Sequence, residues 1–78
     1  MYKVNDILYL NGNTVVSIEG NGSGLKNGVY IKNEKGVSYF IISVGMCRMK
    51  DGEISTSTDL LVDGSFKGKT ISLISNWQ

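Results

Sequence analysis

The sequence predicts an all-β fold, a single small antiparallel six-stranded β-barrel that spans residues 1–78. Apolar residues recur at every second position rather than at the 3.6-residue spacing of a helix. Glycine, asparagine, aspartate and serine interrupt these apolar runs about every ten residues. The chain has ten glycines and no proline, so its turns must be built from glycine and small polar residues.

The first three predicted strands are 6–10, 14–19 and 28–33. The first strand ends at an Asn-Gly-Asn turn signal. Alternation places Val16 and Ile18 on one face of the second strand. In the third strand it places Ile31 beside Val29, with Tyr30 on the opposite side. Each strand therefore has one side that is expected to face a core.

The last three predicted strands are 37–49, 59–63 and 69–74. The strand at 37–49 is apolar on both faces, so we expect it to bend, and Gly45 is the natural place for a kink or bulge. It is followed by Lys50-Asp51-Gly52, a hairpin turn signal. Six short strands in so short a chain favour a closed barrel, because closure removes exposed sheet edges.

The order of these runs resembles a known family. The residues that carry the resemblance are Asp6, Gly12, Thr14, Val15, Val16, Leu25, Lys26, Gly28, Val44, Met46, Arg48, Leu60, Leu61 and Gly64. In this order they resemble the second-domain β-barrel of translational GTPases of the elongation factor Tu type. The resemblance implies a partner-binding surface, since the family's barrel contacts the ribosome and the acceptor end of tRNA. The loop after the second strand lacks the family's arginine-bearing sequence, and we expect neither a preceding GTPase domain nor a bound nucleotide.

The composition excludes several classes of function. The net charge of +1 creates no strong long-range field toward nucleic acid or anionic lipid, although a local basic patch stays possible. The absence of histidine removes the commonest general base and the commonest metal ligand. The single cysteine has no partner for an internal disulfide, which fits a reducing compartment.

The sequence also predicts a soluble, cytoplasmic protein with no membrane partner. No run approaches the ~20 apolar residues that span a bilayer. The first residues lack the apolar run and cleavage site of a signal peptide. We expect a monomer or a weak homo-oligomer.

The glycine cluster at 20–24 raises the question of a phosphate-binding loop. Such a loop needs a following helix, whose N-terminal amides and dipole face the anion. The residues after Gly24 instead have the pattern of a turn followed by a strand. We therefore interpret the cluster as the connection of a strand hairpin.

Other reactive groups do not form a catalytic pattern. Cys47 lies beside Arg48, which can lower a thiol pKa, but no histidine completes a nucleophilic pair. Asp51 and Glu53 are close enough to act as paired acids, yet they flank a hairpin glycine, where solvated acids are common. No metal-binding spacing is present. We expect no enzyme activity, no cofactor and no metal site.

The partner-binding candidates are basic residues with nearby aromatics: Arg48, Lys50, Lys67, Lys69, Tyr30 and Tyr39. The four basic residues flank turns and could lie at one rim of the barrel, where they would contact phosphates while the tyrosines stack on bases. In the alternative interpretation the basic side chains are only solvated residues of turns, Phe66 caps the barrel, and the rings of the tyrosines pack against their neighbours. Trp77 either closes a barrel mouth or contacts a partner.

These observations predict a non-enzymatic binding or adaptor module. It would recognise a protein or RNA partner through a rim or a face of the barrel. The alternative is a structural or accessory protein, such as a phage or mobile-element product, that self-associates or blocks a host protein.

Overall fold

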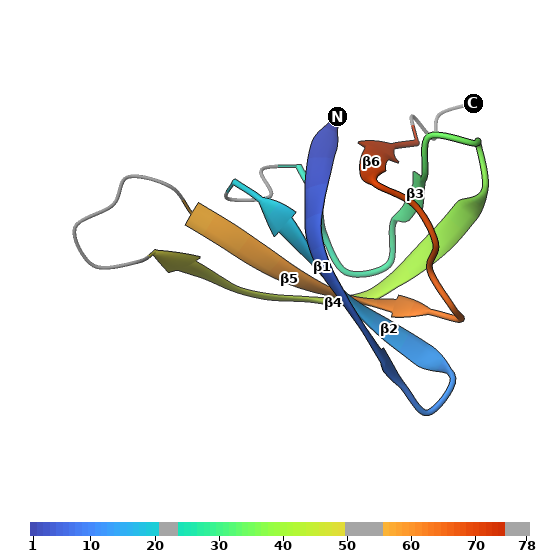
Figure 1. Cartoon of the computed structure of the whole chain (residues 1–78), viewed down its shortest axis with the longest axis horizontal. Coiled ribbons are helices and arrows are strands. Elements are labelled where there is room, and N and C mark those ends of the chain that lie inside the picture. The colour runs from blue at the N-terminus through green and yellow to red at the C-terminus, as the bar shows by residue number, and fades with distance from the viewer. Residues whose placement is uncertain (21–23, 50–55, 75–78) are drawn as a thin grey trace.

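Six antiparallel strands close into a barrel in the computed structural model, which describes residues 1–20, 24–49 and 56–74. The strands are β1 (Tyr2–Leu10), β2 (Asn13–Glu19), β3 (Tyr30–Lys32), β4 (Ser38–Met49), β5 (Thr56–Asp63) and β6 (Thr70–Leu73). Their order around the barrel is β1-β2-β5-β4-β3-β6, and β6 returns to pair with β1 (Figure 1). The described ranges contain no helix. The predicted all-β, six-stranded barrel is confirmed.

Strand β1 begins four residues earlier than predicted, at Tyr2 instead of Asp6. Its pairing with β2 shifts register between Val4 and Asp6, so Asn5 is an extra residue in the strand. A bulge of this kind reverses the side to which later residues point, so the strand shows no single period-two pattern. The early residues of β1 are also the ones that pair with β6 and close the barrel.

The connection between β2 and β3 is not a hairpin, and that prediction is wrong. β2 pairs with β1 and β5, whereas β3 pairs with β4 and β6. The chain therefore crosses from one side of the barrel to the other between these two strands. Leu25, in this connection, is buried in the core, and Gly28 donates a backbone hydrogen bond of 2.8 Å to Ile41. Residues 24–29 contain no helix, so the described residues do not form the phosphate-binding arrangement.

Strand β4 bends as predicted. Its register against β5 shifts twice, once between Ile41 and Ser43 and again between Val44 and Cys47. The second irregularity contains Gly45, where a Cβ atom would lie 3.0 Å from the backbone oxygen of Asp59. Glycine therefore allows β4 to approach β5 closely at the bulge.

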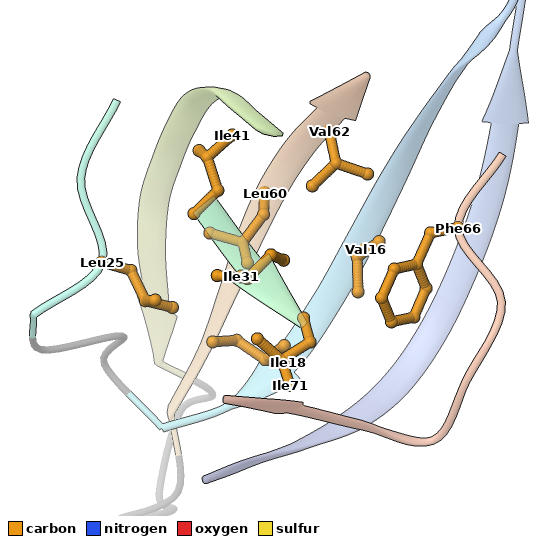
Figure 2. Packing of buried hydrophobic residues seen from close by; sticks show 9 residues of the cluster. All are labelled: Val16, Ile18, Leu25, Ile31, Ile41, Leu60, Val62, Phe66 and Ile71. Atoms are coloured by element: carbon orange, nitrogen blue, oxygen red, sulfur yellow. The ribbon is translucent and has the colours of Figure 1, made fainter. Parts of the chain in front are cut away.

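Apolar side chains from every strand and from two connections fill the barrel, and those of β1 are only partly buried. The buried members of this core are Val16, Ile18, Leu25, Ile31, Ile41, Leu60, Val62, Phe66 and Ile71 (Figure 2). The predicted common face of Val16 and Ile18 is confirmed, since both are fully buried. Figure 2 shows the ring of Phe66 beside Val16. Phe66 thus occupies the core, although it comes from the connection between β5 and β6.

Candidate partner-binding surfaces

The predicted basic rim is only partly assembled by the fold. Lys67 and Lys69 lie in the connection that follows Asp63, the last residue of β5. Arg48 pairs with Ser57, near the first residue of that same strand. At about 3.3 Å per residue, these two ends of β5 are roughly 20 Å apart. Lys50 lies outside the described residues, and the grouping of all four basic residues at one rim stays a prediction. Lys67 donates a hydrogen bond to Tyr39 near the start of β4, so it lies at the opposite end of the β4–β5 pair from Arg48.

The reason is that β4 and β5 form one long antiparallel pair. Figure 1 shows them extending together away from β3 and β6. In the sequence, the turn before β5 and the connection after it interrupt the alternation of apolar residues in the same way. The sequence pattern therefore does not show that basic residues next to these two segments lie at different ends of the strand pair.

The two candidate tyrosines have different environments. The ring of Tyr39 is partly buried against Phe66, with 4.7 Å between ring centroids. Its hydroxyl oxygen accepts a hydrogen bond of 3.3 Å from the backbone N–H of Lys67. Tyr30 is exposed on the opposite side of β3 from Ile31, as predicted, and its ring packs edge-on against Phe40. Tyr39 therefore supports the core, and Tyr30 contributes to the surface.

Five exposed lysines gather around β3 and β6, and we call them the lysine face. They are Lys3, Lys32, Lys35, Lys67 and Lys69. Lys3 is paired with Thr70 and Lys32 with Ser72, both on β6. Lys35 and Lys67 line a common hollow of about 200 Å³ together with Tyr39. Two of the predicted basic residues therefore belong to a larger cationic surface that sequence spacing did not reveal.

Asn33 fixes the connection that carries Lys67. Its side chain is buried, and Nδ2 donates a hydrogen bond of 2.6 Å to the backbone oxygen of Lys67. Its Oδ1 accepts hydrogen bonds from the backbone N–H groups of Lys35 (2.9 Å) and Val37 (3.0 Å). One amide side chain thus joins the β3–β4 turn to the β5–β6 connection.

Glu34 adds a second link between the same segments. Its Oε1 accepts hydrogen bonds from the backbone N–H groups of Lys69 (2.9 Å) and Thr70 (3.1 Å). These hydrogen bonds favour the charged form and lower the pKa of the Glu34 carboxyl, and the one from the Lys69 N–H has the largest effect. The carboxylate is therefore engaged with the backbone in the middle of the lysine face.

A second surface lies on the outer side of β1, β2, β5 and β4, and we call it the leucine groove. Its outward-facing apolar residues are Leu8, Leu10, Val15 and Leu61, and Ile7 and Leu60 also line it. They occupy two adjoining hollows of about 210 and 280 Å³, which share Val15 and Asp59. Leu8 is 57% exposed and Leu10 is 46% exposed, so the apolar floor is open to solvent.

Register brings the groove residues together. Val15 of β2 is paired with Leu8 on one side and with Leu61 on the other. Because directly opposed residues of antiparallel strands point to the same side, the three side chains form one row across the sheet. Val15 points outward because its neighbours Thr14 and Val16 are fully buried.

Carboxylates border this apolar row. Asp6 and Asp59 line the groove, and Asp59 accepts a hydrogen bond of 2.7 Å from the hydroxyl of Ser17. Asp63 lies further along β5, where it is paired with Asn13. The groove therefore combines an apolar floor with a negative border.

Sequence reasoning missed the groove. The run "DILYL" is apolar on both faces, and this double-sided pattern was the available signal. An outward leucine on one strand does not by itself indicate a site. The groove became visible only when pairing placed Leu8, Val15 and Leu61 side by side.

Several other expectations fall outside these surfaces. Asp51, Glu53 and Trp77 are not among the described residues, and the side chain of Cys47 is not described. In the described part of the chain, no group of three or more potential metal ligands occurs. Within those same residues, no helix has the length and apolar character needed to cross a membrane.

The fold defines the class of this protein as a small, closed, six-stranded antiparallel β-barrel. Its sheet of β1, β2, β5 and β4 carries the leucine groove, and its β3–β6 side carries the lysine face. The chain matches no protein-family model, no curated protein and no solved structure.

Proposed function

We propose that this protein is a non-enzymatic binding module that docks a protein partner in the leucine groove. The observation that carries the proposal is the open apolar row of Leu8, Val15 and Leu61. Contiguous exposed apolar surface bordered by polar groups is typical of protein interaction sites. Burying this row against a partner removes apolar area from water, which is the main favourable term in protein association.

The border of the groove specifies the chemistry of the partner. Asp6 and Asp59 favour a surface that presents an apolar side chain beside lysine or arginine. The same carboxylates repel phosphate groups, so the groove suits a protein better than a nucleic acid. The partner is therefore a protein segment that is both apolar and basic.

Affinity capture with matched leucine variants tests this function. The chain is immobilised as wild type, as Leu10→Ser and as Leu73→Ser, and bound host proteins are quantified by mass spectrometry. Leu73 is a close control because it is 44% exposed but lies on β6, away from the groove. We expect a basic protein to be lost from Leu10→Ser and kept by Leu73→Ser.

The captured protein is then purified and titrated against each variant. Direct binding should weaken at least tenfold for Leu10→Ser, and it should also weaken with added salt because charges border the groove. Equal binding to Leu10→Ser and Leu73→Ser would refute the proposal.

A second candidate function is RNA binding at the lysine face. It is favoured by the hollow that Lys35, Lys67 and Tyr39 share. Mobility shift on mixed RNA should then weaken steeply with salt and with the double variant Lys67→Glu, Lys69→Glu. A salt-insensitive shift, or one unchanged by this double variant, would contradict RNA binding there.

The proposal includes the predicted family likeness and cellular location. The six-stranded barrel and the matching residues, from Asp6 to Gly64, support a likeness to the second domain of elongation factor Tu-type GTPases. The single cysteine supports a reducing compartment such as the cytoplasm. The alternative, a structural or accessory protein that self-associates or blocks a host protein, uses the same surfaces and the same assays.

A further inference from the structure

Charges of opposite sign are segregated on this barrel. Among the described residues, four carboxylates lie on β1, β2 and β5: Asp6, Glu19, Asp59 and Asp63. The lysine face comprises Lys32 on β3, Lys3 at the start of β1, and Lys35, Lys67 and Lys69 in the connections next to β3 and β6. Its one carboxylate, Glu34, is engaged by the backbone N–H groups of Lys69 and Thr70. A net charge of +1 therefore conceals a negative side and a positive side.

The centres of the two charged surfaces, β2 and β5 for the groove and β3 and β6 for the lysine face, lie on opposite sides of the barrel, although both surfaces reach β1. In the closed order β1-β2-β5-β4-β3-β6, β2 is three places from β3, and β5 is three places from β6. In a six-stranded barrel, strands three places apart face each other across the core. Figure 1 shows β3 and β6 beside each other, away from the pair formed by β2 and β5.

Each surface also carries exposed apolar groups. The leucine groove presents Leu8 and Leu10, and the β3–β6 side presents Tyr30 (48% exposed), whose ring packs against that of Phe40. Tyr30 lies on the same side of β3 as Lys32, because the two residues are two positions apart in the strand. The lysine face therefore has the two properties that the groove requires of a partner: it is basic and it offers an exposed aromatic ring.

We infer that the lysine face of one copy docks in the leucine groove of a second copy. This inference rests on the proposed function in one respect, the use of the groove as a docking surface. Asp6 and Asp59 of the first copy meet lysines of the second, while Leu8 and Leu10 meet its exposed apolar groups. Opposite charge selects the face that enters the groove, since two grooves brought together would repel each other.

The contact joins two different surfaces, so it is heterologous. Because the surfaces lie on opposite sides, each copy that binds leaves one groove and one lysine face available at the ends. Such contacts extend into chains rather than closing as a dimer. We therefore expect the average mass in solution to rise steadily with protein concentration and to fall when salt screens the charges.

Complementary variants provide the decisive test. Leu8→Arg places a cation in the groove and leaves the lysine face intact. The double variant Lys32→Glu, Lys67→Glu reverses charges on the lysine face and leaves the groove intact. All three positions are exposed, so the substitutions should not disturb the core, which thermal melting by circular dichroism checks.

In sedimentation equilibrium at low salt, each variant alone should remain a monomer over a concentration range in which wild type grows. An equimolar mixture should form a one-to-one dimer and no larger species, because only one working contact exists between the two variants. Lys26→Glu, which reverses a single lysine charge in the β2–β3 connection, should assemble as wild type does. If Leu8→Arg fails to fold, Leu10→Arg replaces it.

Three results would overturn the inference. They are a wild type that stays monomeric at every concentration, single variants that assemble like wild type, and a mixture that stays monomeric. If lysine variants lose RNA binding while wild type is monomeric, the lysine face serves RNA rather than a second copy. If wild type is monomeric but the captured basic protein is lost from Leu10→Ser, only the self-association is refuted and the proposed function stands.

Discussion

Replacing Thr14 by valine should destabilise the barrel by removing one buried hydroxyl. Thr14 is fully buried on β2. Its Oγ1 donates a hydrogen bond of 2.6 Å to the backbone oxygen of Gly64 and accepts one of 2.9 Å from the backbone N–H of Phe66. The hydroxyl therefore holds the start of the β5–β6 connection, from which the Phe66 ring enters the core.

The magnitude follows from the groups left without partners. Valine has nearly the same shape as threonine, so Thr14→Val creates no cavity. It does leave the Phe66 N–H without its partner in the core, and an unsatisfied buried group costs about 1–3 kcal/mol. The Gly64 carbonyl loses its hydroxyl donor as well, which brings the expected loss to about 2–4 kcal/mol. A domain of this size has roughly 4–12 kcal/mol of stability in total.

Urea unfolding measures the effect, with Thr14→Ser as the control. Serine keeps the hydroxyl and loses one methyl group, which is worth about 1 kcal/mol. We expect the midpoint to fall much further for valine than for serine, with the slope of the transition unchanged. Amide exchange at Phe66 should also accelerate in Thr14→Val. A valine variant as stable as the serine variant would show that the hydroxyl does not hold the connection.

Three further predictions concern the links around the two surfaces. Because hydrogen bonds lower the pKa of Glu34, its contribution to stability is present at neutral pH and is lost as pH falls below about 4.3 and through the lowered pKa. Glu34→Gln should remove this part of the acid dependence in denaturation curves recorded from pH 7 to pH 2. An identical acid dependence in wild type and Glu34→Gln would contradict it. Asn33→Ala removes three hydrogen bonds and should cost about 2–4 kcal/mol in urea unfolding, whereas the exposed Lys35→Ala nearby should cost under about 0.5 kcal/mol. Gly45→Val places a Cβ 3.0 Å from the Asp59 backbone oxygen and should lower the stability by about 1–3 kcal/mol, while Gly45→Ala should lower it by less. An unchanged melting temperature in Gly45→Val would show that β4 moves freely at the bulge.

Local pattern was enough to predict the number and approximate positions of the strands, because alternation and turn residues are encoded within each run. The polar start of β5 was missed, since this strand begins at Thr56 and not at the predicted Asp59. The faces of β2 and β3 followed directly from it, as the burial of Val16 and Ile31 shows. Where an extra residue interrupts the alternation, as at Asn5, the pattern no longer indicates the strand's start. Gly45 was recognisable because a glycine inside an apolar strand typically marks a bulge or a close approach of two backbones.

Pairing between distant strands was beyond local pattern. Runs that are neighbours in the sequence are the first ones expected to pair, but β2 pairs with β5, from Asn13 opposite Asp63 to Glu19 opposite Ser57, far along the chain. The position of Arg48 relative to Lys67 and the row formed by Leu8, Val15 and Leu61 both depend on that pairing. The sequence therefore indicated which residue types could bind a partner, and only the closed strand order showed which of them share a surface.

The strands of the barrel are paired over unequal lengths, and this difference affects both surfaces. β2 is paired along its whole length with β5, from Asn13 opposite Asp63 to Glu19 opposite Ser57. β6 is short, and its register with β1 covers only Tyr2 and Lys3. The leucine groove therefore lies on extensively paired strands, where its shape is fixed before a partner arrives. The lysine face lies across the two shortest pairings in the barrel, those of β6 with β1 and with β3, and the Asn33 and Glu34 links join its segments where strand pairing is sparse. Binding at the lysine face should consequently depend on those two links, whereas binding in the groove should not.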